Sequence, residues 1–154
     1  MTNHEHSTEI STLNTLIATT IDSVTGYEDA ASHSEAGQFQ QLFRDRASER
    51  QRVVEDLRAE VRRLGGEPED DGSFIGKTHQ RFLDLKAAIT GRDEKAIINE
   101  VERGEDYLKE KFETALKGDT LSGECRAAVE QAYQSVRSGH DQMSQLKHGL
   151  EASA

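Results

Sequence analysis

Cysteine and proline are almost absent from this sequence, since each occurs once in 154 residues. The single Cys125 excludes an intramolecular disulfide and any metal site built on a Cys-x-x-Cys pair. A single proline leaves long helices uninterrupted, because proline removes a backbone donor and clashes with the preceding helical turn. Tryptophan is missing and aromatic residues make up 5% of the chain. The chain therefore has to fold on aliphatic packing without covalent cross-links.

Long apolar runs and basic clusters are also missing. No run of about 18 apolar residues, the length that crosses a bilayer, occurs anywhere. The first residues, MTNHEHSTEIS, are polar and lack the apolar centre of a signal peptide. The net charge of −10 disfavours binding to nucleic acid or anionic membranes. We therefore expect a cytoplasmic protein with neither of these partners, and a homo-oligomer stays open.

The composition and the apolar periodicity favour helices. A hydrophobic share of 34% and a charged share of 31% suit helices that bury one stripe and expose the rest. Apolar residues recur every three or four positions, which is typical of amphipathic helices. This spacing predicts long helices over 8–32, 35–64, 93–116 and 123–149, and a short helix over 77–90.

Glycine and serine mark the expected turns. Gly65 and Gly66 predict the end of the second helix. The segments SHSEAG and KGDTLSG predict short turns, with Ser34 and Ser122 as N-caps of the helices that follow. Short turns make the first two helices one antiparallel hairpin and the last two another.

A long connection over 66–92 separates the two hairpins. Two hairpins with a long crossover are typical of the ferritin-like pattern. We therefore predict an all-α fold, a ferritin-like four-helix bundle whose crossover contains a short extra helix. Its single domain spans 8–148, with tails at 1–7 and 149–154.

Charged residues interrupt the apolar stripe of the third long helix. Glu105 lies four residues after Val101 and three before Leu108, where an aliphatic residue is expected. Glu102 lies three residues earlier on the same side. An unpaired buried carboxylate costs several kcal/mol. A partner for Glu105 is therefore required.

The other long helices carry polar residues near their middles as well. Arg46, Glu49 and Arg50 fill a gap in the second helix, His140 falls on the stripe of the fourth, and Tyr27 falls on that of the first. The middles of helices meet in an antiparallel bundle. Glu49, Glu105 and His140, with Glu102 nearby, are therefore predicted to converge.

Two interpretations of this cluster stay open. In one, Glu49, Glu102, Glu105 and His140 bind iron or manganese, as carboxylates and imidazole do in di-metal bundles. In the other, arginines close buried ion pairs with the acids; the candidates are Arg46, Arg50, Arg52, Arg103 and Arg137.

Spacing favours the second interpretation. Di-metal bundles use Glu-x-x-His twice, whereas this chain has Glu49-x-x-Arg52 and Arg137-x-x-His140. An arginine beside a site repels metal and pairs with acids. We therefore expect a polar core that includes Tyr27, Arg46, Arg52 and Arg137 around the acids.

Three other candidates for functional sites are expected to have structural roles only. Cys125 falls in the first turn of a helix, where the dipole lowers a thiol pKa, but a packed or surface thiol is favoured over a reactive one. His79 is expected to cap the short helix or to pack against the acids of the loop before it. The acidic run 69–71 lacks the calcium-loop pattern and is expected to be a solvated loop.

Four segments carry a resemblance to a known family. They are LGGEP (64–68), GSFIGKTHQRFLDLK (72–86), ITGRDEKAIINEVERGED (89–106) and GHDQMSQL (139–146). The sequence resembles, over about residues 8–148, the ferritin-like bundle family catalogued as domain of unknown function 2383. The resemblance implies a bacterial bundle distantly similar to bacterioferritins and rubrerythrins, without a known activity.

The resemblance also implies a reduced ligand set. Against a bacterioferritin pattern, Glu49, Glu102 or Glu105, and His140 fall on ligand positions. Arg52 falls where a His belongs, Arg137 where a Glu belongs, and Thr20 near the Glu of the first helix. We therefore expect a degenerate metal site in a non-enzymatic protein with a structural or stress-related role. The alternative is an iron- or manganese-binding carboxylate protein with weak oxidase or metal-handling activity.

Overall fold

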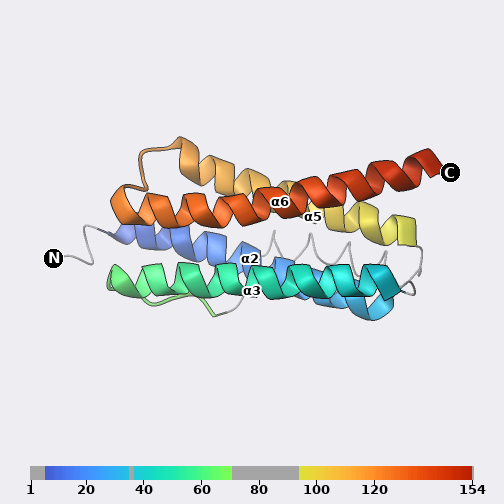
Figure 1. Ribbon diagram of the computed structural model, residues 1–154. Coiled ribbons are helices and arrows are strands. Elements are labelled where there is room, and N and C mark those ends of the chain that lie inside the picture. The colour runs from blue at the N-terminus through green and yellow to red at the C-terminus, as the bar shows by residue number, and fades with distance from the viewer. Residues whose placement is uncertain (1–5, 35–36, 71–93, 154) are drawn as a thin grey trace.

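The computed structural model describes residues 6–34, 37–70 and 94–153, and within these ranges the chain forms four long helices and no strand (Figure 1). The helices are α2 (Ser7–His33), α3 (Gly37–Arg63), α5 (Glu94–Lys117) and α6 (Gly123–Ser153). The prediction of an all-α four-helix bundle is confirmed. The expected short helix over 77–90 and its His79 lie outside the described residues.

Helix α6 is longer than the sequence pattern predicts. It continues to Ser153, past the expected end at residue 149, so most of the predicted C-terminal tail is helical. The prediction ended this helix at about Gly149. A single glycine costs a helix only about 1 kcal/mol relative to alanine, and good helix formers such as Leu and Ala follow it.

The four helices pack as two antiparallel hairpins, α2 with α3 and α5 with α6; α2 also packs on α5, and α3 on α6 (Figure 1). The end of α3 lies beside the start of α2, where Asn14 Nδ2 donates to the Glu67 carbonyl over 3.1 Å. The turn between α5 and α6 reaches the same end, where the Ser122 backbone N–H donates to Glu9 Oε2 over 3.2 Å. Helix α5 therefore begins at the end of the bundle opposite to the one where α3 stops. The connection between them joins opposite ends, which is the predicted single long crossover.

The end of α3 is determined by two glycines, as predicted. Gly65 has a φ of 87°, a left-handed conformation that glycine adopts without steric cost. The Gly65 N–H donates to the Arg62 carbonyl, and the Gly66 N–H donates to the Val61 carbonyl over 3.0 Å. These two bonds form a Schellman motif, which satisfies carbonyls that the helix end leaves free.

The two predicted serine caps have different outcomes. Ser34 is the residue after α2, and its backbone N–H donates to the Ala30 carbonyl. Residues 35 and 36 lie outside the described ranges, so its role as an N-cap of α3 stays a prediction. Ser122 directly precedes α6, and its carbonyl accepts the Arg126 N–H over 3.3 Å.

The hydrophobic core consists of two clusters on either side of a polar layer. One gathers at the end where α2 begins and contains, among others, Leu13, Ile17, Leu57, Phe112 and Val129. The other lies towards the opposite end and contains, among others, Ala30, Phe43, Ile97, Ile98 and Met143. Between them lie Arg50 and Glu105, both buried. Two of the polar residues noted near the helix middles, Arg50 and Glu105, therefore lie inside the core between its two apolar clusters.

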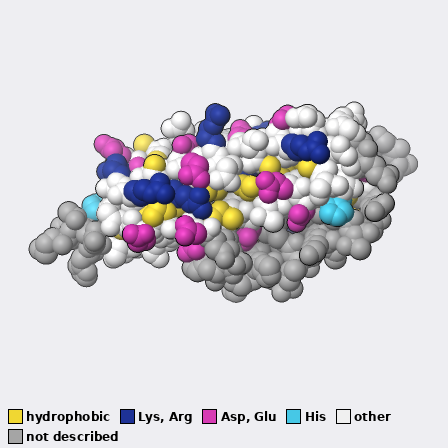
Figure 2. Space-filling view, turned by 90° about the horizontal axis from the view of Figure 1, so that it is seen from below, with side chains coloured by type: hydrophobic (Ala, Val, Ile, Leu, Met, Phe, Trp, Pro, Cys, Tyr) yellow, Lys and Arg dark blue, Asp and Glu magenta, His cyan; other side chains and the backbone are white. Residues whose placement is uncertain are grey.

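The surface is charged and mixed. On the face seen in Figure 2, acidic and basic side chains lie interspersed, with small hydrophobic areas between them. Among the described helices, none combines the length and the apolar character that spanning a membrane requires.

Candidate functional site

A fully buried ion pair joins helices α3 and α5 at the centre of the bundle. Arg50 Nη1 lies 2.5 Å from Glu105 Oε1, and Arg50 Nη2 lies 2.6 Å from Glu105 Oε2. The exposed fraction is 0% for the Arg50 side chain and 2% for that of Glu105. Two parallel bonds between a guanidinium and a carboxylate give the bidentate geometry, which is directional as well as strong.

The other two helices complete this ion pair. The Tyr27 hydroxyl of α2 donates to Glu105 Oε2 over 2.7 Å, and Arg50 Nη1 donates to Ser23 Oγ, also of α2, over 2.7 Å. From α6, the Val136 carbonyl accepts from Arg50 Nη2 over 3.5 Å. We call Ser23, Tyr27, Arg50 and Glu105 the interior ion-pair cluster. Its members engage both oxygens of the buried carboxylate.

The surroundings of Arg50 and Tyr27 shift the pKa values of both side chains upward. Burial acts to lower the pKa of the Arg50 guanidinium, but the charge and hydrogen bonds of Glu105, together with smaller effects of Tyr27 and Glu49, outweigh burial, so the pKa is raised. Burial, followed by the charge of Glu105, raises the pKa of Tyr27 well above its usual value. Arg50 therefore stays a cation and Tyr27 stays a hydrogen-bond donor.

Gly139 of α6 has no side chain, and the interior ion-pair cluster occupies the space that a side chain would fill. A Cβ atom at this position would lie 2.7 Å from Glu105 Oε2 and would clash directly with Arg50 Nη2. A glycine within a helix lowers its stability by about 1 kcal/mol and therefore calls for a packing reason. Here the reason is the close approach of α6 to the ion pair.

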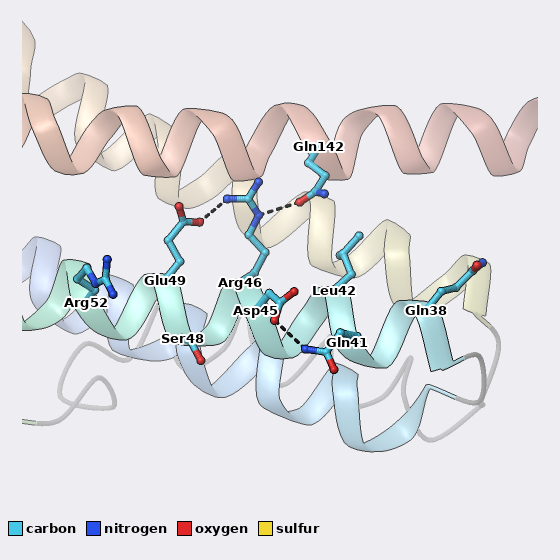
Figure 3. A pocket seen from close by; sticks show the side chains of 9 residues that line it. All are labelled: Gln38, Gln41, Leu42, Asp45, Arg46, Ser48, Glu49, Arg52 and Gln142. Atoms are coloured by element: carbon cyan, nitrogen blue, oxygen red, sulfur yellow. Dashed lines mark hydrogen bonds and ion pairs between the residues drawn. The ribbon is translucent and has the colours of Figure 1, made fainter.

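Glu49 does not join the interior ion-pair cluster, although convergence was predicted. It pairs with Arg46 on its own helix, and 40% of its side chain is exposed. Arg46 Nε donates to Gln142 Oε1 of α6 over 2.8 Å (Figure 3). Successive residues differ by about 100° around a helix, so Glu49 points away when Arg50 points inward.

The predicted polar-core residues separate in the same way. Tyr27 is buried in the cluster, Arg46 lies at the α3–α6 boundary with 14% of its side chain exposed, and Arg52 and Arg137 are exposed. The prediction that Arg52 and Arg137 contribute to the polar core is wrong. The arginine that does so is Arg50, which the stripe pattern placed inward but did not single out from its neighbours.

An open polar groove of about 780 Å³ runs between α3 and α6 (Figure 3). Its lining side chains are Gln38, Gln41, Leu42, Asp45, Arg46, Ser48, Glu49, Arg52 and Gln142. Several are paired with one another, as Gln41 is with Asp45 over 2.8 Å. None of the nine is a histidine, cysteine or tyrosine, so Ser48 has no imidazole among the lining residues to activate it as a nucleophile.

A second polar cluster lies at the boundary of α5 and α6. Glu102, Asp106 and His140 each present one ligand atom, and these atoms all lie within 4.8 Å of one another. The side chains are 12%, 54% and 14% exposed, respectively. Two residues of the predicted metal set, Glu102 and His140, therefore meet here, apart from Glu49 and away from the Arg50–Glu105 pair.

Sequence reasoning missed three participants in these clusters. Asp106 follows Glu102 by one helical turn, a spacing that could have identified it. Gly139 could have been recognised as a glycine inside a helix. Ser23 carries no comparable signal, because a serine near an apolar stripe is common.

Cys125 is a packed thiol, as favoured by the sequence. It is 1% exposed, and burial, followed by the charge of Glu9, raises its pKa to about 12. These effects outweigh the helix N-terminus, which acts in the opposite direction. The pKa of Glu9 itself is lowered, because hydrogen bonds from His6, Ser122 and Cys125 together outweigh its burial.

The fold and the clusters define a class: a four-helix bundle with one long crossover and an arginine–glutamate pair at its centre. A family model described as domain of unknown function (DUF2383) matches residues 8–118. The chain therefore belongs to this family, as its sequence resemblance implied. The match ends before α6, so it is shorter than the expected 8–148. A search of curated proteins found no match to the chain.

Proposed function

We propose that this protein is a non-enzymatic helical bundle with a structural role, in which an arginine cation takes the central position of a carboxylate metal site. The bidentate bond between Arg50 and Glu105 is the observation that supports this proposal. Buried carboxylates need a compensating cation, and either a metal ion or a guanidinium can supply it. Here the guanidinium does so.

The interior donor set does not fit a metal ion. Both oxygens of Glu105 are engaged, by Arg50 and Tyr27. Glu49 points to the groove and pairs with Arg46. His140 and Glu102 face each other at the α5–α6 boundary. An iron or manganese centre built from the expected ligands would need Glu49, Glu102, Glu105 and His140 around one point. The weak oxidase activity of the alternative function depends on such a centre.

Metal loading of the untagged chain tests the proposal. The protein is incubated with Fe(II) or Mn(II) without oxygen and desalted, and ions per chain are counted by mass spectrometry. Glu49→Gln serves as the probe variant, because Glu49 is half-exposed and its loss leaves the core intact. We expect equal metal content in the wild type and in this variant. We also expect oxygen consumption with Fe(II) no faster than in buffer.

Two outcomes would overturn the proposal. One is a metal content that falls when Glu49 is replaced, because only an interior carboxylate centre uses that residue. The other is rapid oxygen consumption with Fe(II) by the wild type that Glu49→Gln abolishes. Both outcomes concern Glu49, so they are distinguishable from any effect at Glu102, Asp106 and His140.

A further inference from the structure

The cluster of Glu102, Asp106 and His140 has a hydrogen-bond imbalance. His140 Nε2 lies 2.5 Å from Asp106 Oδ1, and His140 Nδ1 lies 3.2 Å from Asp141 Oδ1. Ionised carboxylates only accept hydrogen bonds, whereas a neutral imidazole has one N–H and one lone pair. One of the two contacts therefore lacks a donor unless a cation, a proton or a metal ion, lies at the imidazole.

The arrangement around His140 matches that of a metal ligand. Histidines that bind metals usually donate the second ring N–H to a carboxylate, which sets the tautomer and the ring orientation. Asp141 takes that position at Nδ1. The lone pair of Nε2 is then directed towards Asp106, and Glu102 supplies a further oxygen within 4.8 Å.

The backbone holds the three donors on two packed helices. Glu102 and Asp106 are four residues apart on α5, so their side chains lie on one face, one turn apart. His140 comes from α6, which packs against α5 as the second half of the hairpin. A bound ion with ligands at about 2.1 Å would require donors about 3 to 3.5 Å apart. Rotamer adjustments of about one ångström would bring these three side chains to that spacing.

The surrounding charges also favour a cation. Glu102, Asp106 and Asp141 bring three carboxylates to His140. The charge of Lys147 offsets part of theirs, since its Nζ lies 3.4 Å from Glu102 Oε1. Lys147 is a long, partly exposed side chain that can move to solvent when an ion enters. With 54% of its side chain exposed, Asp106 makes the cluster accessible from water.

We infer that Glu102, Asp106 and His140 form a mononuclear binding site for a divalent first-row transition-metal ion. Two carboxylate oxygens and one imidazole nitrogen suit zinc, manganese or ferrous iron, and the imidazole disfavours magnesium and calcium. Three protein ligands leave positions for water, and Asp141 positions His140. The site goes beyond the proposed structural function and does not use the buried ion pair.

Zinc titration of the full, untagged chain by calorimetry tests this inference, since zinc has no oxygen chemistry to complicate the readout. We expect one site in the wild type, with affinity weakened at least tenfold in Asp106→Asn and in His140→Gln. Matched controls are Glu110→Gln, an exposed acid on α5, and His148→Gln, an exposed histidine on α6. Both controls should stay within twofold of the wild type. Magnesium in hundredfold excess should not displace the zinc.

A second measurement distinguishes loss of the metal site from misfolding of a variant. Zinc binding to the folded state raises the thermal midpoint by mass action, so zinc should raise it in the wild type and in both controls. The shift should be smaller in Asp106→Asn. Because the side chain of Asp106 is exposed, we expect this variant to fold normally, which circular dichroism can verify. Equal zinc affinity in all five proteins, or no binding by the wild type, would overturn the inference.

Discussion

At the scale of single residues, the buried pair of Arg50 and Glu105 specifies the bundle more than it stabilises it. Desolvating two charges offsets most of their attraction, so such pairs contribute little net free energy. In addition, Arg50 Nε is buried without a hydrogen-bond partner among the described residues. An unsatisfied donor costs about 1–3 kcal/mol. The two parallel bonds of the pair are directional, however, so they favour the observed relative position of α3 and α5.

Replacing one partner of this pair should therefore be far more damaging than replacing both. We expect Glu105→Gln to lower the free energy of unfolding by about 3–5 kcal/mol, because it leaves the Arg50 charge buried. The double variant Arg50→Met, Glu105→Leu should recover more than half of that loss. Urea unfolding followed by circular dichroism measures both values.

The exposed acid Glu110 on the same helix provides the control for this prediction. Glu110→Gln should change the free energy of unfolding by no more than about 0.5 kcal/mol. A loss below about 1 kcal/mol for Glu105→Gln would contradict a desolvated ion pair. A double variant as unstable as the single one would show that the site cannot be filled by apolar side chains.

At the scale of helices, the approach of α6 to the ion pair depends on the missing side chain at Gly139. The backbone of α6 there faces Arg50 and Glu105 directly, and neither side chain has room to withdraw, because both lie inside the core. Helix α6 also contains Gly149, around which a Cβ atom would meet nothing within 4 Å. Gly139 and Gly149 of α6 thus differ in what surrounds them.

Alanine at the two positions should have opposite effects. Gly139→Ala should lower the free energy of unfolding by about 1–3 kcal/mol, as overpacking does in a close-packed core. Gly149→Ala should leave it unchanged or raise it by up to about 1 kcal/mol, because alanine is the better helix former. Thermal and urea unfolding of the two variants, side by side, measure the difference. Equal effects would mean that α6 does not approach the ion pair this closely.

At the scale of the whole molecule, we expect the free energy of unfolding to depend on pH in alkaline solution. The pKa of Cys125 is raised from its ordinary value near 9 to about 12, and that of Tyr27 is raised well above 10. In this range the folded protein holds more protons than the unfolded chain. The free energy of unfolding therefore falls as the pH rises.

A Cys125→Ala variant tests the contribution of the thiol. We expect the urea midpoint of the wild type to fall between about pH 9 and 12, and to fall less steeply in this variant. Other groups that titrate in the same range affect both proteins and cancel in the comparison. Parallel curves for the two proteins would show that Cys125 is not buried in the folded state. A thiol reagent should also react with the wild type at pH 8 only after unfolding.

The fold was more predictable than the clusters because its signals are local. Apolar spacing and the glycines at 65 and 66 each act within a few residues, and with the length of the connection over 66–92 they predicted four helices and their pairing. The wrong assignments at Arg52 and Arg137 have a different cause. The apolar spacing of a helix identifies its inward-facing positions only to within about one residue. Neighbouring residues differ by about 100° around the helix, so an error of one residue exchanges a core position for an exposed one.

The sequence by itself determined that Glu105 is buried and needs a cationic partner, because its position on an apolar stripe depends only on helical spacing. It also determined where α3 ends, because a left-handed glycine acts on its own helix. Only the tertiary structure decided that the partner is Arg50, and that His140 meets Glu102 and Asp106 rather than Glu105. Those choices depend on how the helices are rotated about their axes when they pack, which is set by contacts between residues far apart in the chain.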